Sequence, residues 1–176
     1  MVAVTNSSEI IPALSQSFNQ RKKKRDSSNL EDIWALLDQV KDPEIPVLSL
    51  WDLGVLQDIL KDEKRITVVI TPTYSGCPAM IEMERDIKET LCRAGYQSVT
   101  IEIRLSPAWS TEMISEQGRQ QLFDYGIAPP SVDKIIICPQ CGAKDTQEIS
   151  QFGSTACKAL YKCNKCLEPF DYFKCL

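Results

Sequence analysis

Two Cys-x-x-Cys pairs constrain the fold of the C-terminal part of this chain. Cys138 and Cys141 form the first pair, and Cys163 and Cys166 form the second, after an interval of twenty-one residues. A pair on a tight turn presents two sulfurs to one metal ion, and two pairs complete the four ligands that structural zinc takes. The spacing predicts a four-cysteine zinc ribbon over residues 134–176, with a rubredoxin-like iron site as the minor alternative.

The remaining composition favours metal over disulfide bonds. The chain has 176 residues, of which eight are cysteine, none is histidine and 43% are hydrophobic. That length suits one α/β domain of about 100 residues plus a small module. No apolar run approaches the ~20 residues that span a bilayer, and no secretory signal is visible. We therefore expect a cytoplasmic protein without a membrane partner, in which reduced cysteines bind metal.

Charge is divided unevenly along the chain. Residues 29–133 carry nine basic and eighteen acidic side chains, whereas residues 1–28 contain the basic run 21–25. We predict residues 1–28 to be a disordered or loosely helical basic tail. An acidic main domain lacks the basic face that phosphate binding needs, so we expect no nucleic-acid partner. A nucleic-acid-binding zinc ribbon, helped by that tail and by stacking aromatic side chains, remains the weakest alternative.

Periodicity predicts an α/β (α+β) domain over residues 29–130, with a small mixed sheet and helices. The expected elements are a helix capped by Asn29 that runs to about Val40, strands over 55–60 and 66–70, a helix over 78–94 ended by Gly95, a strand over 99–105, and a helix from Ser110 or Thr111 to about Tyr125. The first two strands read as a hairpin, and the strand–helix–strand unit as a right-handed parallel crossover. Residues 126–130 read as a linker.

Cys77 is a lone cysteine between a predicted strand and a predicted helix. Pro78 at the first helical position would place the thiol at the positive end of the helix, which lowers a cysteine pKa and enriches thiolate. Without histidine a Cys–His hydrolase dyad is excluded, so metal or cluster binding and redox exchange remain. The acidic loops around Asp42 and Asp52 are expected near this thiol, and Thr73 is a further supporting candidate. A buried, inert cysteine is the alternative.

Three other cysteines have weaker settings. Cys92, late on the predicted helix, is assigned to packing. Cys157 and Cys175 lie in the same module as the four-cysteine site, and a small buried apolar residue is the default role for each. A second ligand set or a redox pair is the alternative for Cys157 and Cys175.

Several motifs, taken in order, resemble the SufT-like metal–sulfur cluster assembly domain family. They are Asp42-Pro-Glu-Ile-Pro46, Asp52-Leu-Gly54, Thr71-x-Thr73-x-x-x-Cys77-Pro78 and Pro107-Ala-Trp109. The stretches over 152–161 and 168–175 are similar to the PaaD family of phenylacetate degradation. The resemblance runs from about Asp32 to Leu176.

The resemblance implies a small α/β domain whose Cys77 helps to assemble or deliver iron–sulfur clusters or iron, with a zinc ribbon appended. Asp52 and Thr73 match motif positions of the family. The implied cofactors are a structural Zn²⁺ and a transient iron–sulfur cluster or iron. The implied partners are the oxygenase and reductase subunits of a phenylacetyl-CoA epoxidase, or iron–sulfur assembly proteins. One thiolate cannot complete a four-ligand cluster, so a homodimer is a further expectation.

Two functions are consistent with these features. The first is an accessory maturation factor for the phenylacetyl-CoA epoxidase of aerobic phenylacetate catabolism, and the alternative is a structural or regulatory subunit of that enzyme. The chain shows no nucleotide loop, no cofactor fingerprint and no histidine base. We therefore do not expect this chain to be catalytic alone.

Overall fold

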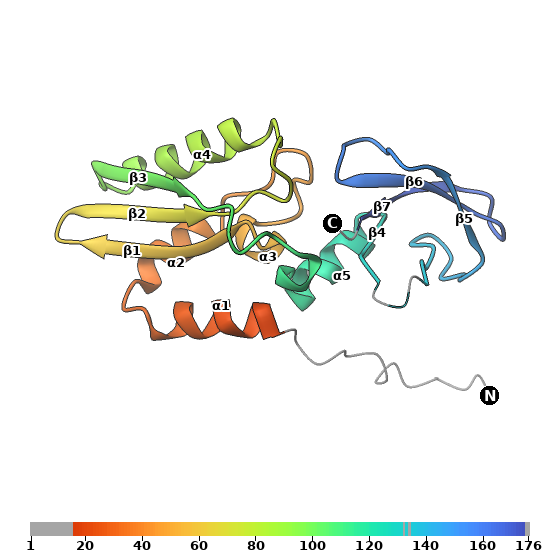
Figure 1. Ribbon diagram of the computed structural model, residues 1–176, viewed down its shortest axis with the longest axis horizontal. Helices are drawn as coiled ribbons and strands as arrows, with labels where there is room; N and C mark the ends of the chain where they lie inside the picture. The colour runs from red at the N-terminus through yellow and green to blue at the C-terminus, as the bar shows by residue number, and fades with distance from the viewer. Residues whose placement is uncertain (1–15, 132, 134, 175–176) are drawn as a thin grey trace.

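The computed structural model describes residues 16–131, 133 and 135–174, which form two small sheets that lie side by side (Figure 1). The strands are β1 (Leu56–Asp62), β2 (Arg65–Ile70), β3 (Ser98–Ile103), β4 (Ile127–Ala128), β5 (Thr146–Ser150), β6 (Lys158–Cys163) and β7 (Pro169–Phe173). The helices are α1 (Gln16–Ser27), α2 (Glu31–Leu37), α3 (Leu50–Leu53), α4 (Met80–Arg93), α5 (Glu116–Asp124) and the 3₁₀ helix η1 (Thr111–Met113). This mixed architecture confirms the predicted fold class.

The first sheet has the strand order β1-β2-β3 and follows the prediction closely. β1 and β2 pair antiparallel as a hairpin, and β2 and β3 pair parallel with α4 as the crossover. Met83, Ile87 and Leu91 of α4 recur at helical spacing and are buried, which explains why this segment packs as an amphipathic helix. Gly95 follows the helix with a φ of 96°, a left-handed conformation that favours glycine.

The first helix after residue 28 differs from its predicted bounds. α2 begins at Glu31, its N-cap residue is Leu30, and that residue makes no side-chain cap hydrogen bond. Asn29 is therefore not the cap. The helix ends at Leu37, and beyond it Lys41 forms an isolated antiparallel bridge with Ser49.

The helix expected over residues 110–125 is divided in two. η1 ends before Ile114, whose backbone is extended, and α5 begins after Ser115. The hydroxyl of Ser115 accepts a hydrogen bond from the Gly118 N–H at 2.8 Å, as an N-cap residue does. A Cβ on Gly118 would lie 2.9 Å from the carbonyl oxygen of Asp52, so glycine permits α5 to lie against α3.

The expected linker over 126–130 instead contributes a strand to the second sheet. Ile127 and Ala128 form β4 and pair parallel with Asp171 and Tyr172 of β7. Both β4 residues are buried, so their apolar side chains account for an element that the flanking glycine and prolines concealed. The second sheet consequently has the order β4-β7-β6-β5.

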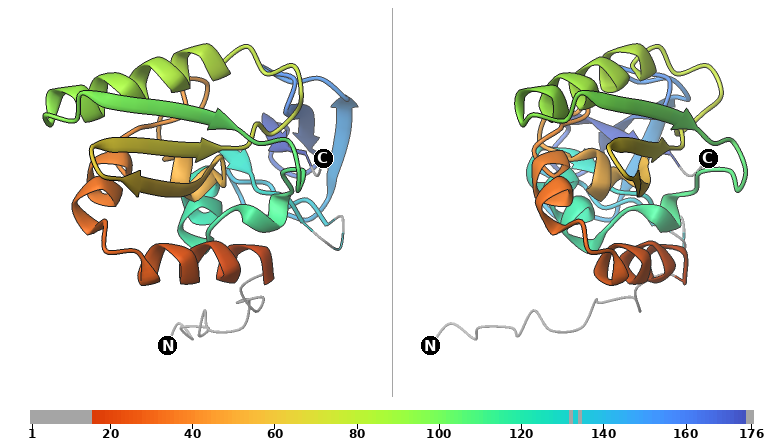
Figure 2. Two further views of the ribbon diagram at one scale, coloured as in Figure 1. Left: turned by 60° about the vertical axis from the view of Figure 1, so that its left-hand side comes forward. Right: turned by 90° about the vertical axis from the view of Figure 1, so that its left-hand side faces the viewer.

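Residues 16–27, which we predicted to be disordered or loosely helical, form the helix α1 along the β1 side of the first sheet, away from α4, so the disordered alternative does not hold for them (Figures 1 and 2). Arg21 is buried, and its guanidinium donates to the carbonyls of Met113, Trp51 and Leu56 at 2.6, 2.8 and 2.7 Å. Its guanidinium carbon lies 4.3 Å from the Trp51 ring centroid. Residues 1–15 lie outside the described residues.

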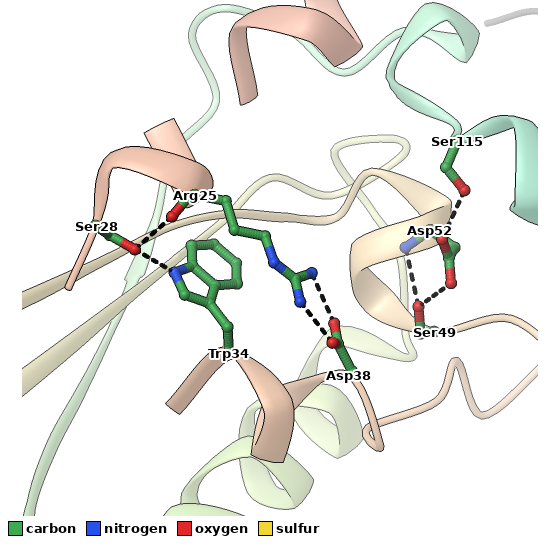
Figure 3. A network of polar contacts seen from close by, with 7 residues as sticks. All are labelled: Arg25, Ser28, Trp34, Asp38, Ser49, Asp52 and Ser115. Carbon is green, nitrogen blue, oxygen red and sulfur yellow. Dashed lines mark hydrogen bonds and ion pairs between the residues drawn. The ribbon is translucent and has the colours of Figure 1, made fainter. Parts of the chain in front are cut away.

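Arg25 also holds α1 to the domain. Its guanidinium donates to both carboxylate oxygens of Asp38, at 2.8 and 2.6 Å, and lies over the ring of Trp34 (Figure 3). The Trp34 indole N–H donates to the hydroxyl of Ser28 at 2.8 Å. The basic run therefore docks through its first and last residues, while the three lysines between them stay at the surface.

The two sheets meet through a packed seam, by which we mean the contact of Cys157 and Phe173 with the first domain. Both residues belong to the large buried cluster that is formed mainly by residues 18–127. The Phe173 ring lies 5.9 Å from the ring of Trp109, whose indole N–H donates to the carbonyl of Leu53 at 3.1 Å. A second, smaller buried cluster fills the ribbon itself. None of the described helices is long and apolar enough to cross a bilayer.

Candidate metal and thiol sites

The four cysteines of the two pairs meet beside the end of β6. Sγ of Cys138 lies 3.7 Å from Sγ of Cys166, and Sγ of Cys141 lies 3.6 Å from Sγ of Cys163. All four sulfurs lie within 4.8 Å of one another. Metal–sulfur bonds of about 2.3 Å in a tetrahedron require sulfurs about 3.8 Å apart, so this set fits one four-coordinate ion. We call this group the four-cysteine cage.

The two cysteine pairs lie on turns with the same hydrogen-bond pattern. The Gly142 N–H donates to the carbonyl of Cys138 at 2.9 Å, and the Leu167 N–H donates to the carbonyl of Cys163 at 3.0 Å. Gly142 and Leu167 both have a left-handed φ, of 70° and 67°. The repeated turn fixes the direction of both sulfur pairs. In the second turn the left-handed position is occupied by Leu167, which is strained there, whereas a glycine would not be.

Backbone amides favour negative charge on Cys163. The N–H groups of Lys165 and Cys166 point at its Sγ, each at 3.4 Å. The pKa of Cys163 is lowered to about 6. The hydrogen bond from the Cys166 amide is the largest cause, and the Lys165 amide adds to it, whereas burial acts in the opposite direction. Thiolate is the form that binds metal, so the turn prepares this sulfur for an ion.

Cys77 lies on the loop between β2 and α4, in a setting that differs from the prediction. α4 begins at Met80 with Ala79 as its N-cap residue, so Cys77 stands three residues before the helix. Burial is the largest influence on the Cys77 thiol, and it raises the pKa of that thiol. The carboxylates of Glu44 and Asp42 raise the pKa further, whereas a hydrogen bond with the backbone of Ala79 lowers it. The prediction of a lowered pKa is wrong, because burial and acidic neighbours outweigh the helix end.

The acidic loop over residues 42–46 lies beside Cys77, as expected. Asp42 is buried, and one of its carboxylate oxygens accepts the N–H groups of Glu44 and Ile45, each at 2.8 Å. Burial raises the pKa of Asp42, and these two amides oppose that effect. Asp42 thus shapes the loop, while half-buried Glu44 is the more accessible carboxylate near the thiol.

Tyr74 is a further neighbour of Cys77, and the sequence analysis did not identify it as one. The Tyr74 side chain lies near the Cys77 thiol and acts to lower the pKa of that thiol, against the larger effect of burial. Burial first, then the neighbouring acidic groups Cys77 and Glu44, raise the pKa of Tyr74 to about 12. Cys157 is buried in the large cluster against which Cys77 and Tyr74 pack. The burial of Cys157 depends on residues far away in the chain, so the sequence carries no periodic signal for it.

Asp52 belongs to a different network from Cys77. Its two carboxylate oxygens accept the hydroxyls of Ser49 and Ser115, each at 2.6 Å, and its N–H donates to Ser49 at 3.0 Å (Figure 3). These contacts cap α3 and tie it to α5. Thr73 is half-buried on the same loop as Cys77. A supporting role for Asp52 or Thr73 at the thiol stays a prediction.

Two cysteines remain to be placed. Cys92 is exposed on α4, so its assignment to packing is wrong: it lies outside the buried stripe of that helix. Cys175 lies outside the described residues.

Comparison with known families divides the chain in the same way as its two sheets. The model of the iron-sulfur cluster assembly protein family matches residues 30–116, and that of the PaaD zinc beta ribbon domain matches residues 127–174. A solved structure of a domain of unknown function from Bacillus anthracis shares 26% identity, covers 52% of this chain and 89% of its own, and superposes with a TM-score of 0.49.

Two related sequences cover different lengths of the chain. The "Fe-S protein maturation auxiliary factor" of Porphyromonas gingivalis is 33% identical over 94 residues, which are 52% of this chain and 89% of that protein. An Escherichia coli K12 protein, named as one subunit of a "Putative 1,2-phenylacetyl-CoA epoxidase", is 44% identical over 154 residues, which are 84% of this chain and 93% of that protein. With an assembly-type domain, a matching ribbon and this near full-length relative, the chain belongs to the PaaD family.

Proposed function

We propose that this chain is an accessory maturation factor for a multicomponent phenylacetyl-CoA epoxidase, to which it delivers iron or an iron–sulfur cluster. Half-buried Cys77 carries the proposal, because it is a thiol outside the four-cysteine cage, on a loop with carboxylates and a phenol around it. The relatives support it, since one is named as an epoxidase subunit and the other as an Fe-S maturation factor.

We assign different roles to the two sulfur sites. The four-cysteine cage is closed, with four ligands in a tetrahedral set and no open position, so we propose that it holds a structural Zn²⁺. Cys77 offers one ligand to its cargo, which therefore takes further ligands from elsewhere. The expected partners are the oxygenase and reductase subunits, iron–sulfur assembly proteins, or a second copy of this chain.

Anaerobic loading tests the cargo. The zinc-containing full chain is incubated with ferrous iron and sulfide, desalted, and analysed for iron, sulfide and zinc, alongside Cys77→Ser and the matched control Cys92→Ser. We expect about one zinc per chain in all three proteins. Iron should be retained by the wild type and by Cys92→Ser, and lost on Cys77→Ser.

Function is tested in cells that lack the gene for this chain but express the epoxidase. Wild type and Cys92→Ser should restore the iron content and the activity of the epoxidase, and Cys77→Ser should not. Equal iron binding and equal restoration by Cys77→Ser would refute the proposal.

A second candidate function is a structural or regulatory subunit, which the name of the E. coli relative favours. In that case the chain co-purifies at a fixed ratio with active epoxidase, and Cys77→Ser is as effective as the wild type. Full activity of the mature enzyme after removal of this chain would exclude the second candidate and favour maturation.

A further inference from the structure

The outer edge of β3 differs from the other sheet edges of the molecule. The first sheet ends in β1 and β3, and the second ends in β4 and β5. β1 and β5 each contain a bulge, β1 also lies beside α1, and β4 is only two residues long. These features prevent a sheet edge from pairing with a further strand. β3 instead pairs with β2 in unbroken register over six residues, and among the edges that the structure describes it alone lacks such protection.

β3 and the two residues that follow it are accessible along this edge. In Figure 1 β3 is the outermost strand of the first sheet. None of residues 98–105 is buried, whereas the neighbouring strand β2 is mostly buried. Ile103 is 48% exposed and Leu105 is 62% exposed. Because side chains alternate along a strand, these two aliphatic groups lie on one face and form an apolar strip at the end of the edge.

The backbone of this edge presents its polar groups in a regular pattern. The Arg104 N–H donates to the carbonyl of Ile70 on β2 at 2.8 Å, which continues the ladder past the end of β3. Successive residues of a strand direct their N–H and C=O groups to opposite sides. Ile101, Ile103 and Leu105 therefore direct these groups away from β2, where no described strand lies. Such an edge is a template for a further strand.

Two charged residues alternate with the aliphatic ones. Nε and a terminal nitrogen of Arg104 donate to Oε1 of Glu102 at 3.0 and 2.7 Å, and both side chains are partly exposed. Charges of a single sign along an edge would repel a second copy. Charges of opposite sign, two residues apart, instead become complementary when the strand meets itself in the antiparallel direction.

We propose that the outer edge of β3 is a dimer interface, to which a second copy of this chain adds its own β3 in the antiparallel direction. The twofold axis passes at Ile103, which faces Ile103 of the second copy. Ile101 then faces Leu105, and Glu102 faces Arg104. The two three-stranded sheets become one sheet of six strands. This interface is independent of the cargo that we propose for Cys77.

Other positions of the axis fit these residues less well. An axis at Glu102 would place two carboxylates opposite each other, which is unfavourable. An axis at Ile101 would place Glu102 opposite Thr100 and would leave Leu105 without an apolar partner. The axis at Ile103 covers both exposed aliphatic side chains and gives each charge a partner of opposite sign.

The size of the interface indicates how tightly the copies bind. The paired segment, residues 101–105 of each copy, is short, and small interfaces are typical of weak association. We therefore expect monomer and dimer in an equilibrium that depends on protein concentration.

Sedimentation equilibrium of the zinc-containing full chain tests the interface, with a reductant present and without iron. The wild type should dimerise as its concentration rises. Ile103→Lys places like charges on the axis and should raise the dissociation constant by about tenfold or more. Ile149→Lys is the matched control, because Ile149 is 54% exposed on the edge strand β5. This control should dimerise as the wild type does.

Exchange of the two charges tests the register. Glu102→Arg and Arg104→Glu each place like charges opposite one another, so each variant alone should associate more weakly than the wild type. Mixed in equal amounts, the two variants should form a heterodimer, because every charge then faces one of opposite sign. An axis at Ile101 predicts no such recovery.

Amide exchange of the wild type, measured by nuclear magnetic resonance, covers the case in which a variant fails to fold. The N–H groups of Ile101, Ile103 and Leu105 point away from β2 and should exchange more slowly as the protein concentration rises. The N–H groups of Glu102 and Arg104 point at β2, so their exchange should not depend on concentration.

Each contrary result has a definite meaning. A monomer up to the solubility limit, with unchanged exchange at the outward amides, would overturn the proposal. Dimerisation that Ile103→Lys leaves intact would also overturn it, because the contact would then lie elsewhere. Weakened charge variants that do not recover when mixed would overturn the axis at Ile103. If exchange slows only when epoxidase subunits are added, a strand of that partner occupies the edge and the dimer is excluded.

Discussion

A single leucine marks the weaker half of the four-cysteine cage. Leu167 is 63% exposed and has a φ of 67°, while the equivalent residue of the other turn is Gly142, with a φ of 70°. A side chain in the left-handed region costs roughly 1 kcal/mol relative to glycine, because its Cβ crowds the backbone. Since the exposed leucine side chain gains little from packing, this cost is not offset.

We therefore expect opposite effects of two matched substitutions. Leu167→Gly should stabilise the ribbon by about 0.5–1 kcal/mol, and Gly142→Ala should destabilise it by about 1 kcal/mol. The rate at which a chelator removes zinc reports both changes: it should fall for the first variant and rise for the second. Equal rates for both variants would show that the turn geometry does not control metal retention.

The thiol of Cys77 gives a second prediction for a single residue, which concerns pH. Burial, with Glu44 and Asp42, raises its pKa, so less thiolate is present at neutral pH than in an unstructured cysteine peptide. Thiolate is the form that is alkylated, so iodoacetamide should modify Cys77 more slowly than it modifies a peptide of residues 71–79. The rate should keep rising above the pH at which the peptide rate levels off.

Peptide mapping by mass spectrometry follows Cys77 separately from the other cysteines, and exposed Cys92 shows that reagent is not limiting. A Cys77 rate at neutral pH equal to that of the peptide would contradict the raised pKa.

Among the elements, α1 is the one that composition concealed. Five basic residues in a polar segment are typical of a solvated tail, and only tertiary structure reveals that Arg21 meets three backbone carbonyls and a tryptophan ring. By contrast, the hairpin, α4 and the crossover are visible in the sequence, because local periodicity and Gly95 specify them. The strand β4 could not be predicted from local sequence either, because its partner β7 lies far along the chain and the pairing is a tertiary contact.

Arg21 should account for much of the docking of α1. Arg21→Met keeps the apolar stem but leaves the carbonyls of Met113, Trp51 and Leu56 without this donor, which costs about 2–4 kcal/mol of unfolding free energy. Lys23→Met on the exposed face of α1 is the control and should change stability by less than about 0.5 kcal/mol. Urea unfolding measures both. A similar small effect of the two substitutions would mean that α1 is not held by Arg21.

At the scale of the whole molecule, spacing predicted the ligands of the cage but not how the ribbon packs on the first domain. The four sulfurs come from two local turns, and a turn is encoded where it occurs. The burial of Cys157 instead depends on how the ribbon packs on the first domain, where the ring of Phe173 lies against that of Trp109. The predicted helix-end environment of Cys77 failed for the same reason, since burial by distant loops outweighs the local helix.

This packing predicts that metal loss from the cage affects the seam between the ribbon and the first domain. Cys163 lies at one end of β6 and Cys157 directly precedes the other, so a ribbon that unfolds without its metal should release Cys157 from the seam. After chelation of zinc, alkylation of Cys157 should accelerate by more than tenfold, and amide exchange should increase in β5, β6 and β7. The first domain has its own large core and should keep slow exchange in β2 and α4.

Trp109→Phe serves as the control, because it alters the same contact while the metal stays in place. If Cys157 stays protected after the zinc has been removed, the ribbon is held by its seam alone and the metal does not govern access to Cys157.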